Sequence, residues 1–269
     1  MQPIVILGSN GMLGSMLTWY ARNRGHEVIA VDRTMFDVQV DTISKLEVYI
    51  IGAKCVINCI GAIPQRKYTE SQYYELNATF PQKLATHCLK FNIPLIHVST
   101  NCVFSGSKAF CTESDIPDAT DTYGKSKALG EPNTAVVVRC SIIGPELHTK
   151  FGLMEWFLSN TGEVNGYTDH YWNGLTTLEL SKQIFRLIDE RRFDCGVYHF
   201  YSSNTLSKYE ILECISRHVP VEKRSKINPV DVGIKHYTLT SNKIHGAKPI
   251  EEQIADIFEI IKYYRNKND

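Results

Sequence analysis

Two side chains that could act together on a carbonyl group, Tyr123 and Lys127, lie four residues apart in this chain. Residues at that spacing share one face of a helix, and a nearby ammonium lowers the pKa of a phenol. A phenol whose pKa is lowered from about 10 can donate a proton near neutral pH. Upstream, Ser99 and Thr100 end an apolar run, where a hydroxyl can hold the oxygen of a carbonyl that is being reduced. We therefore predict that Thr100, Tyr123 and Lys127 are catalytic residues.

The same Tyr-x-x-x-Lys spacing occurs again at Tyr263 and Lys267. In a chain with 14 tyrosines, about one such match arises by chance, so the spacing alone proves little. The second pair lies in a polar tail without a companion motif, and we predict that it is a surface feature.

A glycine-rich loop follows the first apolar run and precedes a helical pattern. A loop in that place presents backbone N–H groups and the positive end of the helix dipole to a pyrophosphate. We therefore predict a dinucleotide cofactor, NADH or NADPH. The cofactor-binding residues of this loop are Gly8, Asn10, Gly11, Met12, Leu13 and Gly14.

Asp32 ends the second apolar run, where a carboxylate would accept hydrogen bonds from the adenosine ribose. Arg33 follows and could pair with a 2′-phosphate instead. Asp32 favours NADH and Arg33 favours NADPH, so the sequence leaves the choice open. Asp37 and Val38 are further candidates, beside the adenine ring.

Strand-like and helical patterns alternate through the first 140 residues. Continuous apolar runs occupy residues 3–7, 27–31, 54–60, 94–99 and 135–140, with helical patterns at 12–24 and 73–91. This order predicts an α/β protein with a Rossmann-like, doubly wound parallel sheet.

The second half of the chain is less regular. Helical patterns occupy 151–158, 177–190 and 249–264, a strand is predicted at 196–201, and 223–248 is polar and irregular. Ser207 and Glu210 form a capping-box pattern for a helix to about residue 217. We predict an NAD(P)-binding domain at 1–145, to which 176–201 returns, and a smaller substrate-binding lobe from 146–175 and 202–269.

The sequence resembles the extended short-chain dehydrogenase/reductases, within them the dTDP-4-dehydrorhamnose reductase branch. The likeness is good over about 1–145 and looser beyond. The segments that carry it are 8–14, 99–106, 113–117 running into 123–131, and 138–144, with a weaker match at 56–62 and 76–79.

The resemblance implies that NAD(P)H reduces C4 of a nucleotide-linked 4-keto-6-deoxyhexose, with a dTDP or UDP carrier, for polysaccharide precursors. Tyr123 would protonate the C4 oxygen, Thr100 would orient the keto group, and Lys127 would tune Tyr123 and bind the nicotinamide ribose. Further residues expected around the cofactor are Cys59, Ile60, Gly61, Asn77 and Ser99.

The chain departs from the family where the substrate should be recognised. Asn101 and Cys102 replace the usual Asp-Tyr, and residues 174–177 lack the usual proline. These departures leave the identity of the sugar open. The predicted substrate contacts are Asn101, Cys102, Phe104, Tyr123, Ser141 and Trp172.

Cys102 supports a second hypothesis. GDP-fucose synthases and plant-type UDP-rhamnose synthases place an acid/base cysteine at this spacing from the catalytic Thr, and it epimerises carbons beside the ketone. A thiolate could remove such a proton, which would make the protein a bifunctional 3,5-epimerase and 4-reductase. His148, Lys150 and Glu155 are candidates for the partner acid. The alternative is a small packing residue.

Composition excludes other classes of protein. Lys plus Arg and Asp plus Glu both number 29, which argues against a nucleic-acid or membrane-surface partner. Eight cysteines without a zinc-binding pattern predict no metal site and a reducing, cytoplasmic location. The Tyr-rich segment 68–74 could pack against a second copy in a homodimer, or into the core. A third hypothesis is a non-catalytic, nucleotide-binding regulatory subunit.

Overall fold

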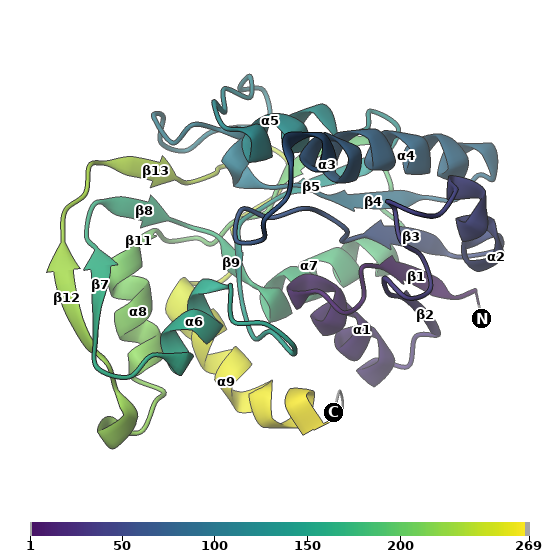
Figure 1. Cartoon of the computed structure of the whole chain (residues 1–269). Coiled ribbons are helices and arrows are strands. Elements are labelled where there is room, and N and C mark those ends of the chain that lie inside the picture. The colour runs from purple at the N-terminus through teal and green to yellow at the C-terminus, as the bar shows by residue number, and fades with distance from the viewer. Residues whose placement is uncertain (1, 267–269) are drawn as a thin grey trace.

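The computed structural model describes residues 2–266, so Met1 and residues 267–269, with Lys267 of the second Tyr-Lys pair, lie outside it. Within the described residues, a six-stranded parallel sheet forms the centre of the molecule (Figure 1), which confirms the predicted α/β fold class. Its strands from edge to edge are β2 (Val28–Val31), β1 (Ile4–Leu7), β3 (Cys55–Asn58), β4 (Leu95–Val98), β5 (Val136–Arg139) and β10 (Gly196–His199).

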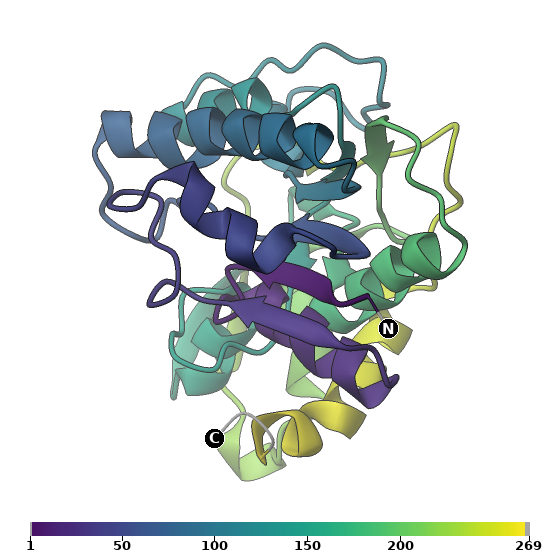
Figure 2. The same cartoon turned by 90° about the vertical axis from the view of Figure 1, so that its right-hand side faces the viewer.

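Helices cover both faces of this sheet and build most of the second lobe (Figures 1 and 2). The α-helices of the described chain are α1 (Met12–Asn23), α2 (Glu47–Ile50), α3 (Glu70–Tyr74), α4 (Phe80–Lys90), α5 (Thr122–Leu129), α6 (Leu153–Ser159), α7 (Thr177–Asp189), α8 (Lys208–Ser216) and α9 (Ile250–Asn266). Helices α1, α4, α6, α7, α8 and α9 lie close to where the sequence patterns predict them, whereas α2 was not predicted.

The side chains of β1 explain the layered arrangement. All four are buried, and successive residues point to opposite faces of the sheet. Ile4 and Ile6 pack in one core with residues of α1 and α7. Val5 and Leu7 pack in another core with residues of α2 and α4. The strand is therefore apolar throughout, as expected for a sheet covered on both faces.

The strand order reverses at β1, because β2 lies on one side of it and β3 on the other. Ligands of open parallel sheets bind outside the carboxyl ends of the strands at such a reversal. The glycine-rich loop follows β1, and the loop that contains Cys59 and Gly61 follows β3. The fold thus brings both predicted cofactor segments to one place.

The predicted helix over 73–91 is divided into three parts. After α3 the backbone forms a π-helical segment, Glu75–Thr79, before α4 begins with Pro81 in its first turn. Apolar spacing alone does not reveal this break. The π-helical segment contains the fully buried Asn77, whose contacts account for its position below.

The smaller lobe contains short strands that the sequence does not reveal. In the polar segment 223–248, β12 pairs in parallel with β7 and β13 pairs in parallel with β8. None of their residues is fully buried, and their sequences lack an apolar alternation. The strands outside the main sheet are β6 (Ile142–Ile143), β7 (Glu163–Tyr167), β8 (His170–Trp172), β9 (Leu175–Thr176), β11 (Leu206–Ser207), β12 (Lys226–Val230) and β13 (Lys235–Tyr237).

The chain passes between the two lobes more than once. After β7 and β8, helix α7 packs against α1, and β10 pairs with β5 at the edge of the main sheet. The chain then enters the smaller lobe again through α8, whose Ser207–Glu210 capping box is confirmed. Among residues 2–266, no helix is both long and apolar enough to cross a lipid bilayer.

Candidate active site

Helix α5 places Tyr123 and Lys127 on one face. The helix begins after Asp121, whose carboxylate caps it by accepting a hydrogen bond from Gly124 N at 2.9 Å. Tyr123 is partly buried, whereas Lys127 is only 5% exposed and its Nζ donates to the carbonyl oxygen of Val98 at 2.8 Å. The lysine thereby ties α5 to the end of β4.

Thr100 approaches this face from β4. Its hydroxyl accepts a hydrogen bond from Cys102 N at 3.1 Å and lies close enough to the Tyr123 phenol to lower the pKa of that phenol. The predicted hydroxyl and phenol therefore meet at the carboxyl edge of the sheet, with the ammonium of Lys127 one helical turn away. A carbonyl oxygen placed between Thr100 and Tyr123 would receive two hydrogen bonds.

Burial controls the ionisation of both titratable groups. It raises the pKa of Tyr123, and the hydrogen bond from Thr100 offsets this rise only in part. It lowers the pKa of Lys127 to about 8, against the opposing charge of Glu131. The sequence predicted that Lys127 would lower the phenol pKa. In the structure loss of solvent dominates, and the nearby Cys102 adds to the rise.

A buried ion pair supports the lysine. Glu131 accepts hydrogen bonds from two nitrogens of Arg139, and Ser99 donates its hydroxyl to the same carboxylate at 2.6 Å. This contact gives Ser99 a partner within the protein, and its assignment as a cofactor contact stays a prediction. The ends of β4 and β5 are thus joined behind Lys127.

The glycine-rich loop packs closely against its neighbours. A Cβ on Gly8 would lie 3.1 Å from backbone atoms of Cys59 and Ile60, and a Cβ on Gly14 would lie 2.2 Å from Gly8 O. These glycines let the two loops and α1 approach closely. Gly11 caps α1 without a side-chain hydrogen bond, and the first turn holds no acidic residue. The helix end thus suits a pyrophosphate, and the residues present fit the cofactor.

The segment after β2 is organised around Asp32. Its carboxylate accepts hydrogen bonds from Thr34 and from Asn10 of the glycine-rich loop, at 3.1 Å for Asn10. The hydrogen bond from the Thr34 side chain lowers the pKa of Asp32 most. Arg33 is 63% exposed and pairs with Asp37 at 2.9 Å. Val38 packs beside the apolar core of this face.

Asn77 joins the loop after β3 to α5. Its side chain exchanges two hydrogen bonds with the backbone of Ala62, at 2.8 and 3.1 Å, and donates to Ser126 Oγ at 3.1 Å. A Cβ on Gly61 would lie 3.9 Å from Lys127 Nζ. Asn77 therefore braces the cleft, and Gly61 stands beside the lysine as the cofactor assignment requires.

Cys59 and Ile60 form the rest of this wall. Cys59 N donates to Leu7 O at 3.0 Å, and Ile60 N donates to Asn58 Oδ1 at 3.1 Å. Burial raises the pKa of the Cys59 thiol to about 12, while the charge of Lys127 opposes that rise. The thiol is therefore an uncharged lining group.

Of the predicted substrate contacts, Asn101, Phe104 and Trp172 are buried and Ser141 is partly buried. Trp172 is 5% exposed, and its indole donates to Ser141 Oγ at 2.7 Å. Phe104 packs under the guanidinium of Arg139, 5.3 Å from its ring centre. Asn101 is buried and donates to Tyr237 O at 3.0 Å. These contacts give each polar atom named a partner within the protein, and the assignment of the four residues to the substrate stays a prediction.

Other residues reach the site without a sequence signal. The ring of Tyr73 meets that of Tyr123 edge to face, with centroids 6.5 Å apart. Tyr237 and Lys208 approach from the smaller lobe, since the charge of Cys102 affects the pKa of each. Tyr73 belongs to the Tyr-rich segment that we assigned to core or dimer packing. Only the tertiary fold brings these residues near Cys102 and Tyr123.

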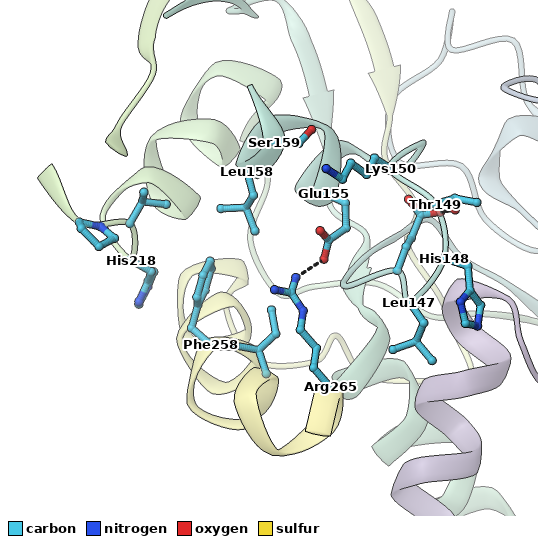
Figure 3. Close-up of a pocket in the computed structure, with 14 residues that line it drawn as sticks. Leu147, His148, Thr149, Lys150, Glu155, Leu158, Ser159, His218, Phe258 and Arg265 are labelled. Atoms are coloured by element: carbon cyan, nitrogen blue, oxygen red, sulfur yellow. Dashed lines mark hydrogen bonds and ion pairs between the residues drawn. The ribbon is translucent and has the colours of Figure 1, made fainter. Parts of the chain in front are cut away.

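Cys102 is partly buried beside the catalytic groups. Burial raises the pKa of its thiol, whereas the hydrogen bond with Thr100 and the charge of Lys208 lower it. The candidate partner acids lie elsewhere: His148, Lys150 and Glu155 line a separate cavity of about 580 Å³ (Figure 3). There Glu155 is paired with Arg265 at 2.6 Å. Neither Cys102 nor the catalytic trio lines that cavity.

Comparison with known proteins identifies the family. A family model described as the RmlD substrate binding domain matches residues 1–238. The chain belongs to the RmlD substrate binding domain family. The match covers the six-stranded sheet and the residues Thr100, Tyr123 and Lys127. The resemblance to the dTDP-4-dehydrorhamnose reductase branch, which we inferred from the motifs, is confirmed.

Curated relatives and solved structures agree with the RmlD family. dTDP-4-dehydrorhamnose reductase of Mycolicibacterium smegmatis is 25% identical over 78% of this chain and 67% of its own length. The Mycobacterium tuberculosis enzyme of that name is 32% identical, but over 51% of this chain and 49% of its own length. The Bacillus anthracis enzyme, solved with NADP, superimposes with a TM-score of 0.82 at 20% identity, covering 96% of this chain and 99% of that one. The last comparison shows a common fold.

Proposed function

We propose that the protein is an NAD(P)H-dependent reductase of a nucleotide-linked 4-keto-6-deoxyhexose. The observation that carries this function is the meeting of Thr100, Tyr123 and Lys127 beside a glycine loop that fits a dinucleotide. Family membership and relatives named dTDP-4-dehydrorhamnose reductase support the substrate class, with dTDP or UDP as the carrier. Such an enzyme supplies deoxysugar donors for polysaccharides, in the cytoplasm.

The cofactor, when bound, supplies the hydride for the sugar carbon. Tyr123 supplies the proton to the C4 oxygen, and its raised pKa keeps the phenol protonated at neutral pH until that oxygen becomes basic. Thr100 donates a second hydrogen bond, which orients the carbonyl and stabilises its developing charge. Lys127 binds the ribose hydroxyls near the nicotinamide.

The choice between NADH and NADPH depends on Asp32 and Arg33. The carboxylate of Asp32 is held toward Asn10 of the glycine-rich loop, a place suited to a ribose diol. The exposed guanidinium of Arg33 lies next to it and is suited to a 2′-phosphate. We propose that both coenzymes are accepted, and a comparison of kcat/KM for NADH and NADPH tests this.

The direct test is incubation with NADPH or NADH and a panel of dTDP- and UDP-linked 4-keto-6-deoxyhexoses. Loss of absorbance at the reduced nicotinamide band and a product reduced at C4 are the expected results. If no panel member is reduced while the cofactor binds, the proposal is wrong in its substrate. If neither NADH nor NADPH binds, the hypothesis of a nucleotide-binding regulatory subunit is contradicted as well.

Epimerisation through Cys102 remains a second proposal. The thiol lies next to Thr100, and Lys208 favours its thiolate. Burial opposes this by raising the pKa, so the thiol is better suited to donate a proton than to remove one. Solvent deuterium at C3 or C5 of the product, absent in a Cys102→Ala variant, is expected for an epimerase. Product without deuterium from an unepimerised substrate assigns Cys102 to packing.

A further inference from the structure

Lys208 is a partly buried cation without an anionic partner. Among residues 2–266 its ammonium makes no hydrogen bond and no ion pair, and it lies 6.0 Å from the ring centre of Tyr167 and 5.7 Å from that of Tyr237. Burial lowers its pKa, and only the charge of Cys102 opposes this. A cation withdrawn from water normally has a counter-ion, so its position is unfavourable in the ligand-free protein.

The carboxylates closest in sequence or space have other partners. Glu210 accepts hydrogen bonds from Ser207 N and Oγ, at 2.7 and 2.9 Å, as part of the helix cap. Asp121 caps α5 through Gly124 N, and Asp169 accepts from the backbone of Val232 at 2.9 Å. The chain therefore brings the cation to the site without an internal anion to neutralise it.

The backbone around Lys208 holds it in this unfavourable place. Lys208 is the first residue of α8, where the positive end of the helix dipole disfavours a second positive charge. The start of α8 packs closely on β7, because a Cβ on Gly166 would lie 3.0 Å from Tyr209 Cα. A residue that lowers stability and is held rigidly at a site is expected to serve binding.

We infer that Lys208 binds the diphosphate of the sugar nucleotide. C1 and C4 lie on opposite sides of a pyranose ring, so a sugar with C4 at Thr100 and Tyr123 directs its C1 diphosphate away from α5. Lys208 approaches the Cys102 side of those residues from the smaller lobe, because its ammonium lies 5.7 Å from the ring centre of Tyr237, whose backbone oxygen accepts the hydrogen bond of Asn101. The inference rests on the proposed function, because only a sugar nucleotide places a ketone and a diphosphate one ring apart.

The test measures binding of UDP and of dTDP to the full chain by calorimetry, with oxidised NADP present. Lys208→Met is expected to raise both dissociation constants about 10- to 100-fold, the effect of one lost charge-assisted contact. Lys208→Arg should restore most of the affinity. Lys226→Met is the matched control, because Lys226 is an exposed lysine of the same lobe that pairs with Glu163 at 3.1 Å. It removes the same charge and should leave binding unchanged.

Two further measurements separate this role from others. Uridine and thymidine, which lack phosphates, should bind wild type and Lys208→Met equally. The melting temperature of Lys208→Met should be equal to or above that of wild type, since the variant removes an unfavourable charge. A structural lysine would give a lower melting temperature instead.

Unchanged dissociation constants in Lys208→Met, or no binding of either diphosphate to wild type, overturns the inference. If Lys208→Met keeps the dissociation constants of wild type but no longer incorporates solvent deuterium into the product, Lys208 would instead act in proton transfer with Cys102. If the diphosphates bind through Lys208 but no 4-keto sugar is reduced, the inference stands and the proposed reaction fails.

Discussion

Glu131 accepts hydrogen bonds from Nε and Nη2 of Arg139 at 2.8 and 2.7 Å, and both side chains are almost fully buried. The same carboxylate receives the Ser99 hydroxyl, and Glu131 follows the C-cap of α5, four residues after Lys127, whose pKa its charge raises. One ion pair thus connects β4, β5 and the catalytic helix. It supports the charge of Lys127 as well as the geometry.

Replacing Glu131 by Gln should destabilise the protein by about 3–5 kcal/mol, because Arg139 would lose its buried counter-ion. The pKa of Lys127 should also fall below about 8, since the charge of Glu131 now raises it. Thermal unfolding and the pH–rate profile measure the two effects. In the exposed pair of Arg186 and Glu190, Glu190→Gln should change neither. An unaltered alkaline limb in Glu131→Gln would show that Lys127 does not depend on Glu131.

Removing the phenol oxygen of Tyr123 should lower kcat about 10²- to 10⁴-fold, because the C4 oxygen would lose its proton donor. Binding of the reduced cofactor, followed by fluorescence, should stay within a few-fold of wild type. The control for Tyr123→Phe is Tyr263→Phe, which alters the exposed tyrosine of the second Tyr-Lys pair. Equal turnover of the two variants would favour the regulatory-subunit hypothesis.

The buried ammonium of Lys127 predicts a pH dependence of stability. Its pKa is about 8 in the folded protein against a model value of 10.5, so between these values the unfolded chain binds more protons. The free energy of unfolding contributed by this residue therefore rises with pH, by about 3 kcal/mol in total. Lys127→Met lacks this rise. Urea unfolding measures the free energy of unfolding of both proteins from pH 7.5 to 10.5. Relative to Lys127→Met, the wild type should gain stability as the pH rises. A difference that stays constant over this range contradicts the prediction.

Gly130→Ala should be strongly destabilising. Gly130 has an ordinary φ of −87°, but a Cβ there would lie 1.7 Å from the carbonyl oxygen of Asn77. The clash would separate α5 from the π-helical segment, at a cost of at least about 2 kcal/mol. Differential scanning calorimetry measures it. Leu129→Ala, a change at the exposed neighbouring position, should leave the melting temperature nearly unchanged.

The sheet could be predicted from the sequence because its signals are local, and a local signal also led to the catalytic assignment of Thr100, Tyr123 and Lys127, which stays a prediction. An apolar run such as residues 3–7 defines a strand by itself, and the spacing of Tyr123 and Lys127 places them on one face of a helix. The parallel topology then brings Thr100 to the same edge. The motifs that indicated the family and the fold are local signals of the same kind.

The substrate side could not be predicted in this way. Trp172 and Phe104 are aromatic residues for which the sequence pattern gives no burial. Only the tertiary packing shows that they are buried. Lys208 lies 106 positions after Cys102 in the chain, and no periodicity links them. Strands β12 and β13 were missed because their residues, none of them fully buried, give no apolar alternation.

The repeated crossing of the chain between its lobes affects how new specificities can arise. The segment that contains β7 and β8 and the segment that begins with β11 are separated in sequence by α7 and β10, yet their strands pair in two small sheets. A chimera that exchanges only one of them with a relative would join mismatched halves. To transfer a sugar preference between relatives by recombination, both distant stretches of the gene would therefore have to be exchanged together. Substitutions at single positions such as Lys208 leave the pairing of these two segments intact.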